Sequence, residues 1–306
     1  MSRPPALVLL NPAARHGRAG RLWDRVRREV EQRFDSSVVP IDPGGTWKRD
    51  VRASLRAGTR VFVAAGGDGT VHALAGAIVE ARDDVPLGDI CLGAVGLGSS
   101  NDFHKPFECL RSGIPLRLDM DRAAPRDLGR IRWVDAEGRD RESVLVVSAS
   151  AGVVAEGNAL FSSCRLGRHL PSLAIAVAAF RAIARHSTSR VLIRHDGGQE
   201  QIELSSLSVL KTQWLSGSLR YDLPIAADDG LLGVALCEAM GRPRLLGTLA
   251  GLARGRFAGR PGTRAFQTAA LELGADTPLL LEIDGEVGLA RHATFDLFPE
   301  RLLACA

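Results

Sequence analysis

The N-terminal part of the chain alternates short apolar runs with amphipathic segments. Short apolar runs bounded by turn residues indicate buried strands, and apolar residues that recur every three or four positions indicate helices. We expect strands at residues 6–10, 38–41, 60–65 and 90–95, and helices at residues 22–34, 50–57 and 70–81. Strand, turn and helix follow one another repeatedly, which is the pattern of a parallel sheet covered by helices.

The pattern changes after about residue 125. From there on, apolar runs are joined mainly by short polar turns, and long amphipathic segments are fewer. We expect strands at residues 128–134, 143–149, 189–195, 201–210, 233–237 and 279–283, and helices at residues 171–185 and 242–253. Strands connected by short turns are mostly antiparallel, so we expect a β-sandwich-like second domain.

Length and composition agree with a globular protein of two domains. The chain has 306 residues, of which 45% are hydrophobic and 24% charged, which is ample material for a core. Its five cysteines are odd in number, scattered and without CxxC spacing, which argues against a disulfide framework or a zinc site and fits a reducing cytosol. No apolar stretch reaches the roughly 18 residues that a transmembrane helix needs, so we expect no membrane span.

The basic residues are nearly all arginines. The net charge is +4, and the lysines are Lys48, Lys105 and Lys211. Arginine grips phosphate through a planar fork of donors. The positive excess is too small to decide between a polyphosphate ligand, an anionic membrane surface and an ordinary solvated surface. We expect no nucleic-acid partner.

The strongest chemical signal is the turn after the third strand. It reads Gly66, Gly67, Asp68, Gly69 and Thr70, and a helix follows at once. Glycines let backbone N–H groups approach a phosphate, and a helix N-terminus favours an anion. Asp68 can orient an acceptor hydroxyl, hold a magnesium–water network, or simply cap the helix at a sharp strand-to-helix turn. The sequence leaves these three roles open.

Two further polar loops follow strands of the same sheet. One begins at Asn11 and the other spans residues 96–103, with Ser99, Asn101 and Asp102. The carboxyl ends of parallel strands meet at one edge of a sheet, where open α/β folds bind their ligands. We therefore expect the three loops to converge on a nucleotide phosphate, which favours a kinase.

These motifs, in this order, resemble those of the bacterial diacylglycerol kinase-like lipid kinases, which are relatives of sphingosine and ceramide kinases. The resemblance covers nearly the whole chain. It rests on NP-x-x-x-x-G at Asn11, GGDGT at residues 66–70, GLGSSNDF at residues 96–103, DDGLL at residues 228–232 and DGE at residues 284–286. GGDG alone is shared with NAD kinases and phosphofructokinases, whereas the later motifs are more specific.

The resemblance implies an α/β fold with two domains. Residues 1–127 would form a three-layer α/β ATP-binding domain of the NAD kinase and diacylglycerol kinase type. Residues 128–287 would form a C-terminal β-sandwich for substrate and metal, and residues 288–306 would return to the first domain. The implied cofactors are ATP and Mg²⁺.

The resemblance also implies roles for individual residues. Asp229, with the backbone carbonyls of Ala226 and Leu231, would hold a structural magnesium ion. Asp284 and Glu286 would lie beside the reaction centre, with Asp68, and Glu286 would be the general base. The candidates for ATP contact are Asn11, Gly66, Gly67, Asp68, Gly69, Thr70, Ser99, Asn101 and Asp102.

The chain departs from the family pattern at several positions. His72 and Ala73 stand where the family usually has Asn-Glu, Ser99 replaces a threonine, and Gly233 replaces an aspartate. These departures indicate a divergent subgroup, and the sequence does not tell whether they reduce the activity or redirect it to another acceptor.

The functional prediction is a cytoplasmic ATP- and Mg²⁺-dependent lipid kinase, peripheral to the inner membrane face. Its partner would be a lipid at the membrane surface. The enzyme would phosphorylate a hydroxyl group of this diacylglycerol-like or sphingoid-like lipid. The alternatives are an NAD kinase-like enzyme with a soluble acceptor and a catalytically silent nucleotide-binding protein. The sequence does not name the acceptor lipid, and it leaves open whether the chain forms a homodimer.

Overall fold

The computed structural model describes residues 3–135, 137–162 and 171–306, and it divides into two compact units. The first unit runs to Leu128 and includes Pro299–Ala306, whereas the second is Gly129–Phe298. This mixed α/β architecture confirms the predicted fold class. None of the helices in the described ranges is long and apolar enough to cross a membrane.

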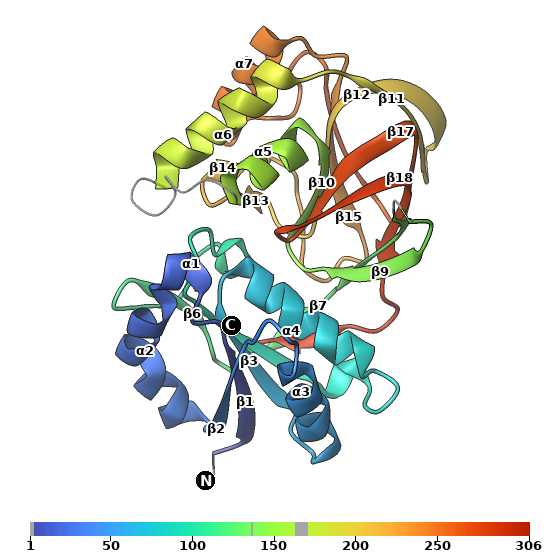
Figure 1. Ribbon diagram of the computed structural model, residues 1–306. Helices are drawn as coiled ribbons and strands as arrows, with labels where there is room; N and C mark the ends of the chain where they lie inside the picture. Colours follow the sequence, from blue (N-terminus) through green and yellow to red (C-terminus); the bar gives the residue numbers. More distant parts are fainter. Residues whose placement is uncertain (1–2, 136, 163–170) are drawn as a thin grey trace. The chain divides into compact units, whose positions relative to one another are not determined.

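The first unit is built on a mainly parallel sheet (Figure 1). Its strand order is β2-β1-β3-β4-β19-β7, with β6 also paired to β4 and to β5. The pairs β1–β2, β1–β3, β3–β4 and β4–β19 are parallel. Its strands are β1 (Pro5–Leu10), β2 (Asp35–Pro40), β3 (Val61–Gly66), β4 (Cys91–Gly96), β5 (Leu110–Arg111), β6 (Ile114–Arg117), β7 (Ala124–Arg126) and β19 (Leu302–Ala304).

Helices cover both faces of this sheet. Figure 1 shows α2 on one side and α3 and α4 on the other. Strands buried on both faces must be apolar throughout, and β3 and β4 are buried at every position. The helices are α1 (Ala14–Gly17), α2 (Ala19–Arg33), α3 (Trp47–Arg56) and α4 (Asp68–Glu80), with short 3₁₀ turns η1 (Leu87–Asp89) and η2 (Asp102–His104).

The second unit is a strongly bent antiparallel sheet. Its order is β16-β15-β12-β10-β17-β18-β8-β9, and β11 joins β12 to β17. Both β10 and β11 bridge β12 and β17, so the sheet folds over a common apolar core. The strands are β8 (Gly129–Val134), β9 (Asp140–Leu145), β10 (Ser148–Gly152), β11 (Ser189–His195), β12 (Gly198–Leu210), β15 (Leu232–Glu238), β16 (Thr263–Thr268), β17 (Leu271–Ile283) and β18 (Glu286–Leu297), with the small pair β13 (Trp214–Leu215) and β14 (Leu219–Arg220).

Three helices belong to this second unit as described: α5 (Val153–Ser162), α6 (Pro171–Arg185) and α7 (Arg242–Leu252). The predictions of α6 and α7 are confirmed, whereas α5 was not predicted. The single strand expected at residues 143–149 is two strands, β9 and β10, because the backbone bends between Leu145 and Ser148.

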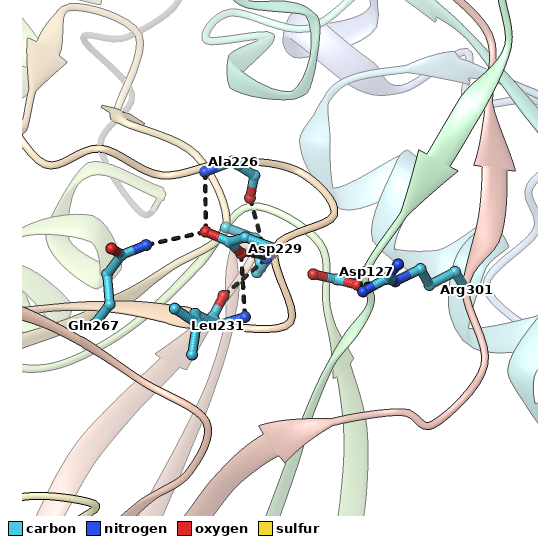
Figure 2. Close-up of polar contacts among 7 residues, drawn as sticks. Asp127, Ala226, Asp229, Leu231, Gln267 and Arg301 are labelled. Atoms are coloured by element: carbon cyan, nitrogen blue, oxygen red, sulfur yellow. Dashed lines mark hydrogen bonds and ion pairs between the residues drawn. The ribbon is translucent and has the colours of Figure 1, made fainter.

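The chain returns to the first unit later than predicted. β18 pairs with β17 and β8 of the second unit, so residues 288–297 lie there. The returning segment begins at Pro299, and its strand β19 inserts between β4 and β7. An ion pair fastens it: Arg301 Nε donates to Asp127 Oδ1 at 2.7 Å (Figure 2). The Asp127 side chain is only 4% exposed.

Replacing Arg301 tests this fastening. Arg301→Ala removes a charge-assisted hydrogen bond from a buried carboxylate, so the first unit should lose about 1–3 kcal/mol of unfolding free energy. Urea denaturation measures the loss. The control is Arg27→Ala, because Arg27 pairs with Glu31 on an exposed helix face and should matter by less than about 0.5 kcal/mol. Equal effects of the two substitutions would contradict this role.

Candidate active site

Two glycine loops pack directly on each other at the carboxyl ends of β3 and β4. A Cβ atom on Gly66 would overlap the hydroxyl of Thr70, and one on Gly98 would overlap the Cα of Gly67. Position 98 therefore requires glycine for the contact between the two loops, and position 66 requires it for the packing of its own turn, besides any approach of a phosphate. Backbone hydrogen bonds from Leu97 and Gly98 to the carbonyl of Gly66 complete the contact.

Asp68 joins the same two loops through its carboxylate. Oδ2 accepts the amide of Asp102 at 3.0 Å, and Oδ1 accepts the amide of Phe103 at 2.9 Å. Asp68 is the first residue of α4, and the helix cap is Gly67, so the capping role considered from the sequence is wrong.

Asn101 and Asn11 hold the loops from within. Asn101 adopts a left-handed conformation with φ of 51°, and its side chain bonds Gly96 and Gly98. Asn11 Nδ2 donates to Thr70 Oγ1 at 3.2 Å. The structure thus brings the Asn11 loop to the first turn of α4, as the topology predicts.

The residues after Asn101 anchor this loop in the unit. Asp102 and Lys105 form an ion pair at 2.7 Å, with side chains only 4% and 7% exposed. Phe103 is buried with the Arg126 guanidinium 4.5 Å from its ring centre. Burial and the nearby arginines lower the pKa of His104 to about 3, so this imidazole stays neutral. Asp102 thus has a structural role in this loop, through its ion pair with Lys105.

What this edge of the sheet can bind is an anion. Gly69 and Ser99 are exposed there, beside the N-terminus of α4 with its positive dipole end. Exposed arginines, Arg15 and Arg18, follow β1 at the same edge. His72 is buried within α4, so the departure from the family motif lies inside the helix packing.

In the second unit, Asp284 is a clamp on the backbone. It has φ of 48° in the turn between β17 and β18. Oδ2 accepts the amide of Val146 at 2.7 Å, and Oδ1 accepts those of Val147 and Ser148 at 2.9 and 2.8 Å. The three backbone amides at the bend between β9 and β10 therefore all find a hydrogen-bond acceptor in this carboxylate.

Two glutamates flank Asp284 in different surroundings. Glu286 begins β18 and is exposed. Glu282 is 3% exposed and accepts hydrogen bonds from Ser150 Oγ, Asn158 Nδ2 and the amide of Gly285. Burial raises the pKa of the Glu282 carboxyl above its ordinary value. The sequence did not predict Glu282 as a site residue.

The three predicted magnesium ligands do come together, but around an ammonium group. Lys211 Nζ donates to Leu231 O at 2.8 Å, to Ala226 O at 3.2 Å and to Asp229 Oδ1 at 3.3 Å. Gln267 donates to the other carboxylate oxygen of Asp229 at 3.0 Å (Figure 2). With Lys211 Nζ among these three oxygens, the residues present do not fit a magnesium ion at this position.

An apolar cavity lies in the second unit between α5, α6, α7 and the sheet. Its walls include Phe161, Ile175, Ala179, Leu249 and Phe257. Asn158 and Ser216 also line it, and the Ser216 hydroxyl donates to Asn158 Oδ1 at 2.9 Å. Asn158 in turn donates to Glu282, so one part of an otherwise apolar cavity is polar.

Family models match both units. Residues 5–128 match the diacylglycerol kinase catalytic domain, and residues 146–305 match the YegS C-terminal NAD kinase beta sandwich-like domain. The chain belongs to the family of bacterial diacylglycerol kinase-like lipid kinases, and it is a kinase.

Individual relatives agree with this assignment. A probable lipid kinase YegS-like from Xanthomonas oryzae is 29% identical over 288 residues, which is 90% of this chain and 89% of the relative. One of the same description from Pseudomonas fluorescens is 29% identical over 295 residues, covering 94% and 90%. A crystal structure of a putative diacylglycerol kinase from Bacillus anthracis shares the fold, with TM-score 0.74, 15% identity and coverage of 100% and 98%.

The clamp predicts a stability effect for Asp284. In Asp284→Asn the side-chain NH₂ cannot accept an amide, so one N–H at the bend loses its acceptor. The second unit should lose about 1.5–3 kcal/mol of unfolding free energy. Urea unfolding followed by circular dichroism measures this. Asp276→Asn, an exposed carboxylate on β17, is the control and should be neutral. An Asp284→Asn protein as stable as the wild type would refute the clamp.

Proposed function

We propose that this lipid kinase transfers the γ-phosphoryl group of ATP to a hydroxyl of a diacylglycerol-like or sphingoid-like lipid. The acceptor oxygen would form the new bond to phosphorus, the bond to ADP would break, and the hydroxyl proton would pass to a carboxylate. Phosphoryl transfer of this kind depends mainly on positioning and charge neutralisation.

The apolar cavity of the second unit supports the proposal that the acceptor is a lipid. Its lining is almost entirely hydrocarbon, whereas a soluble acceptor such as a dinucleotide needs polar groups along its whole length. The polar group formed by Asn158, Ser216 and Glu282 would suit the hydroxyl-bearing end of a lipid whose chain lies among the helices.

The paired glycine loops support the ATP part. The N-terminus of α4, Ser99 and the arginines after β1 would receive the phosphates, and Asn11 and Asn101 would keep the loops in place. Mg²⁺ would accompany ATP and neutralise its phosphates. We propose that the protein works at the membrane surface, on the cytoplasmic side, where ATP and the lipid acceptor are both present.

A screen of acceptors with labelled ATP tests the reaction. Diacylglycerol, sphingosine and NAD are offered separately in detergent micelles, with a no-acceptor control. Label should appear in a lipid product. Transfer to NAD alone would establish the soluble-acceptor alternative, and ATP binding without transfer would establish a silent nucleotide-binding protein.

Filling the cavity tests where the lipid binds. Ala179→Phe adds a ring inside the cavity, so the KM for lipid should rise by at least about tenfold while ATP affinity stays unchanged. Ala176→Phe is the matched control, because Ala176 lies exposed on the same helix. Steady-state kinetics at saturating ATP give the result. Equal KM values for the two variants would place the lipid elsewhere.

Glu286 is proposed as the general base that receives the hydroxyl proton. Only the transition state uses that transfer, so Glu286→Gln should lower kcat by about 10²-fold or more and spare ATP affinity. ATP titration and turnover are measured on the same protein. Near wild-type turnover would assign the proton to another carboxylate, of which Asp68 is the first to test.

A further inference from the structure

The loop of residues 226–231 closes around a positive charge that the chain itself supplies. Two backbone carbonyls and the Asp229 carboxylate are oxygen ligands of the kind that hard divalent cations prefer. In this chain they surround Lys211 Nζ, at the distances given above. We propose that the Lys211 ammonium is a built-in cation that takes the place of a divalent metal ion in this loop.

The ammonium matches the loop in chemistry and in distance. A lysine head group carries only N–H donors, and Ala226, Asp229 and Leu231 each present an oxygen to it. The separations of 2.8–3.3 Å are those of N–H···O hydrogen bonds, and they exceed the roughly 2.0–2.1 Å of magnesium–oxygen bonds. The Lys211 side chain is 0% exposed, so its charge must be paired where it lies.

The Asp229 carboxylate has further partners within the protein. The carboxylate oxygens of Asp229 also accept the amides of Leu231 and Ala226 and the amide group of Gln267. A Cβ on Gly233 would lie 2.7 Å from Ile225 Cδ1, so a side chain at position 233 would require Ile225 to move. Within the described ranges, no group of three or more His, Cys, Asp or Glu could hold a metal ion.

The backbone of Lys211 connects this loop to the segment that Asp284 binds. The backbone amide of Lys211 donates to Val147 O at 2.9 Å, and the amide of Val147 donates to Asp284 Oδ1. Lys211, which follows β12 directly, thus contacts the loop through its ammonium group and the bend before β10 through its backbone amide. The geometry of the loop should therefore be independent of free Mg²⁺, and only the ion that travels with ATP should matter.

Metal binding to the nucleotide-free wild type is the first test. Mn²⁺ alone is titrated and followed by electron paramagnetic resonance, and thermal unfolding is compared in EDTA and in millimolar Mg²⁺. We expect no specific Mn²⁺ site and the same Tm in both buffers. This assay needs neither ATP nor lipid, so its outcome is separate from that of the kinase proposal.

Two substitutions of different volume complete the test. Lys211→Ala leaves the three oxygens around an open space, so it should bind Mn²⁺ at least about tenfold more tightly than the wild type, as expected for a site freed of a competing charge. Its lowered Tm should rise again with Mg²⁺. Lys211→Met, which fills the space with an apolar chain, should show the lowered Tm without the recovery.

The opposite results overturn the proposal. A single Mn²⁺ site in the wild type that disappears in Asp229→Asn would show that a metal binds this loop beside the lysine. A folded Lys211→Ala protein that binds no Mn²⁺ would show that the loop is not a cation site. If neither lysine variant folds, the wild-type titration with Asp229→Asn decides alone.

Discussion

The second unit is organised around one carboxylate, that of Asp284, bound to three consecutive backbone amides. Charged acceptors make the stronger hydrogen bonds, and here they replace the ladder bonds that β9 and β10 cannot make at their bend. The bend frees β10 to pair with β12 on one side and β17 on the other. The turn that carries Asp284 therefore also sets where Glu282 and Glu286 lie, one beneath α5 and one exposed.

The size of the space among the oxygens of Ala226, Asp229 and Leu231 explains why a lysine, and not an arginine, stands at position 211. Of the three lysines, Lys105 and Lys211 have buried side chains paired with Asp102 and Asp229. A compact ammonium fits among three oxygens where a planar guanidinium does not. A lysine in an arginine-rich sequence, directly after a predicted strand, is thus a signal in the sequence for the buried ammonium of Lys211.

The sequence predicted the elements whose burial follows a simple period. Helix α6 and strand β11 have the bounds expected from it, and the meeting of the Asn11, GGDGT and NDF loops follows from parallel topology alone. Glu282 was not predicted because side chains along β17 point alternately to the two faces of the sheet. This alternation places Glu282 on the face opposite the main core, which the sequence pattern indicates to be exposed to solvent. Helix α5 covers that face, and its sequence, with Gly157 and no clear apolar period, did not predict a helix.

The contacts of the acidic residues narrow the choice of a proton acceptor. Asp68 spends both oxygens on loop amides, and Asp284 spends both on the bend before β10. Burial raises the pKa of the Glu282 carboxyl, and its two oxygens already accept three hydrogen bonds, from Ser150, Asn158 and Gly285. Glu286 is exposed at the start of β18. A carboxylate that must accept a proton in each turnover is better placed there than where its charge holds the backbone together.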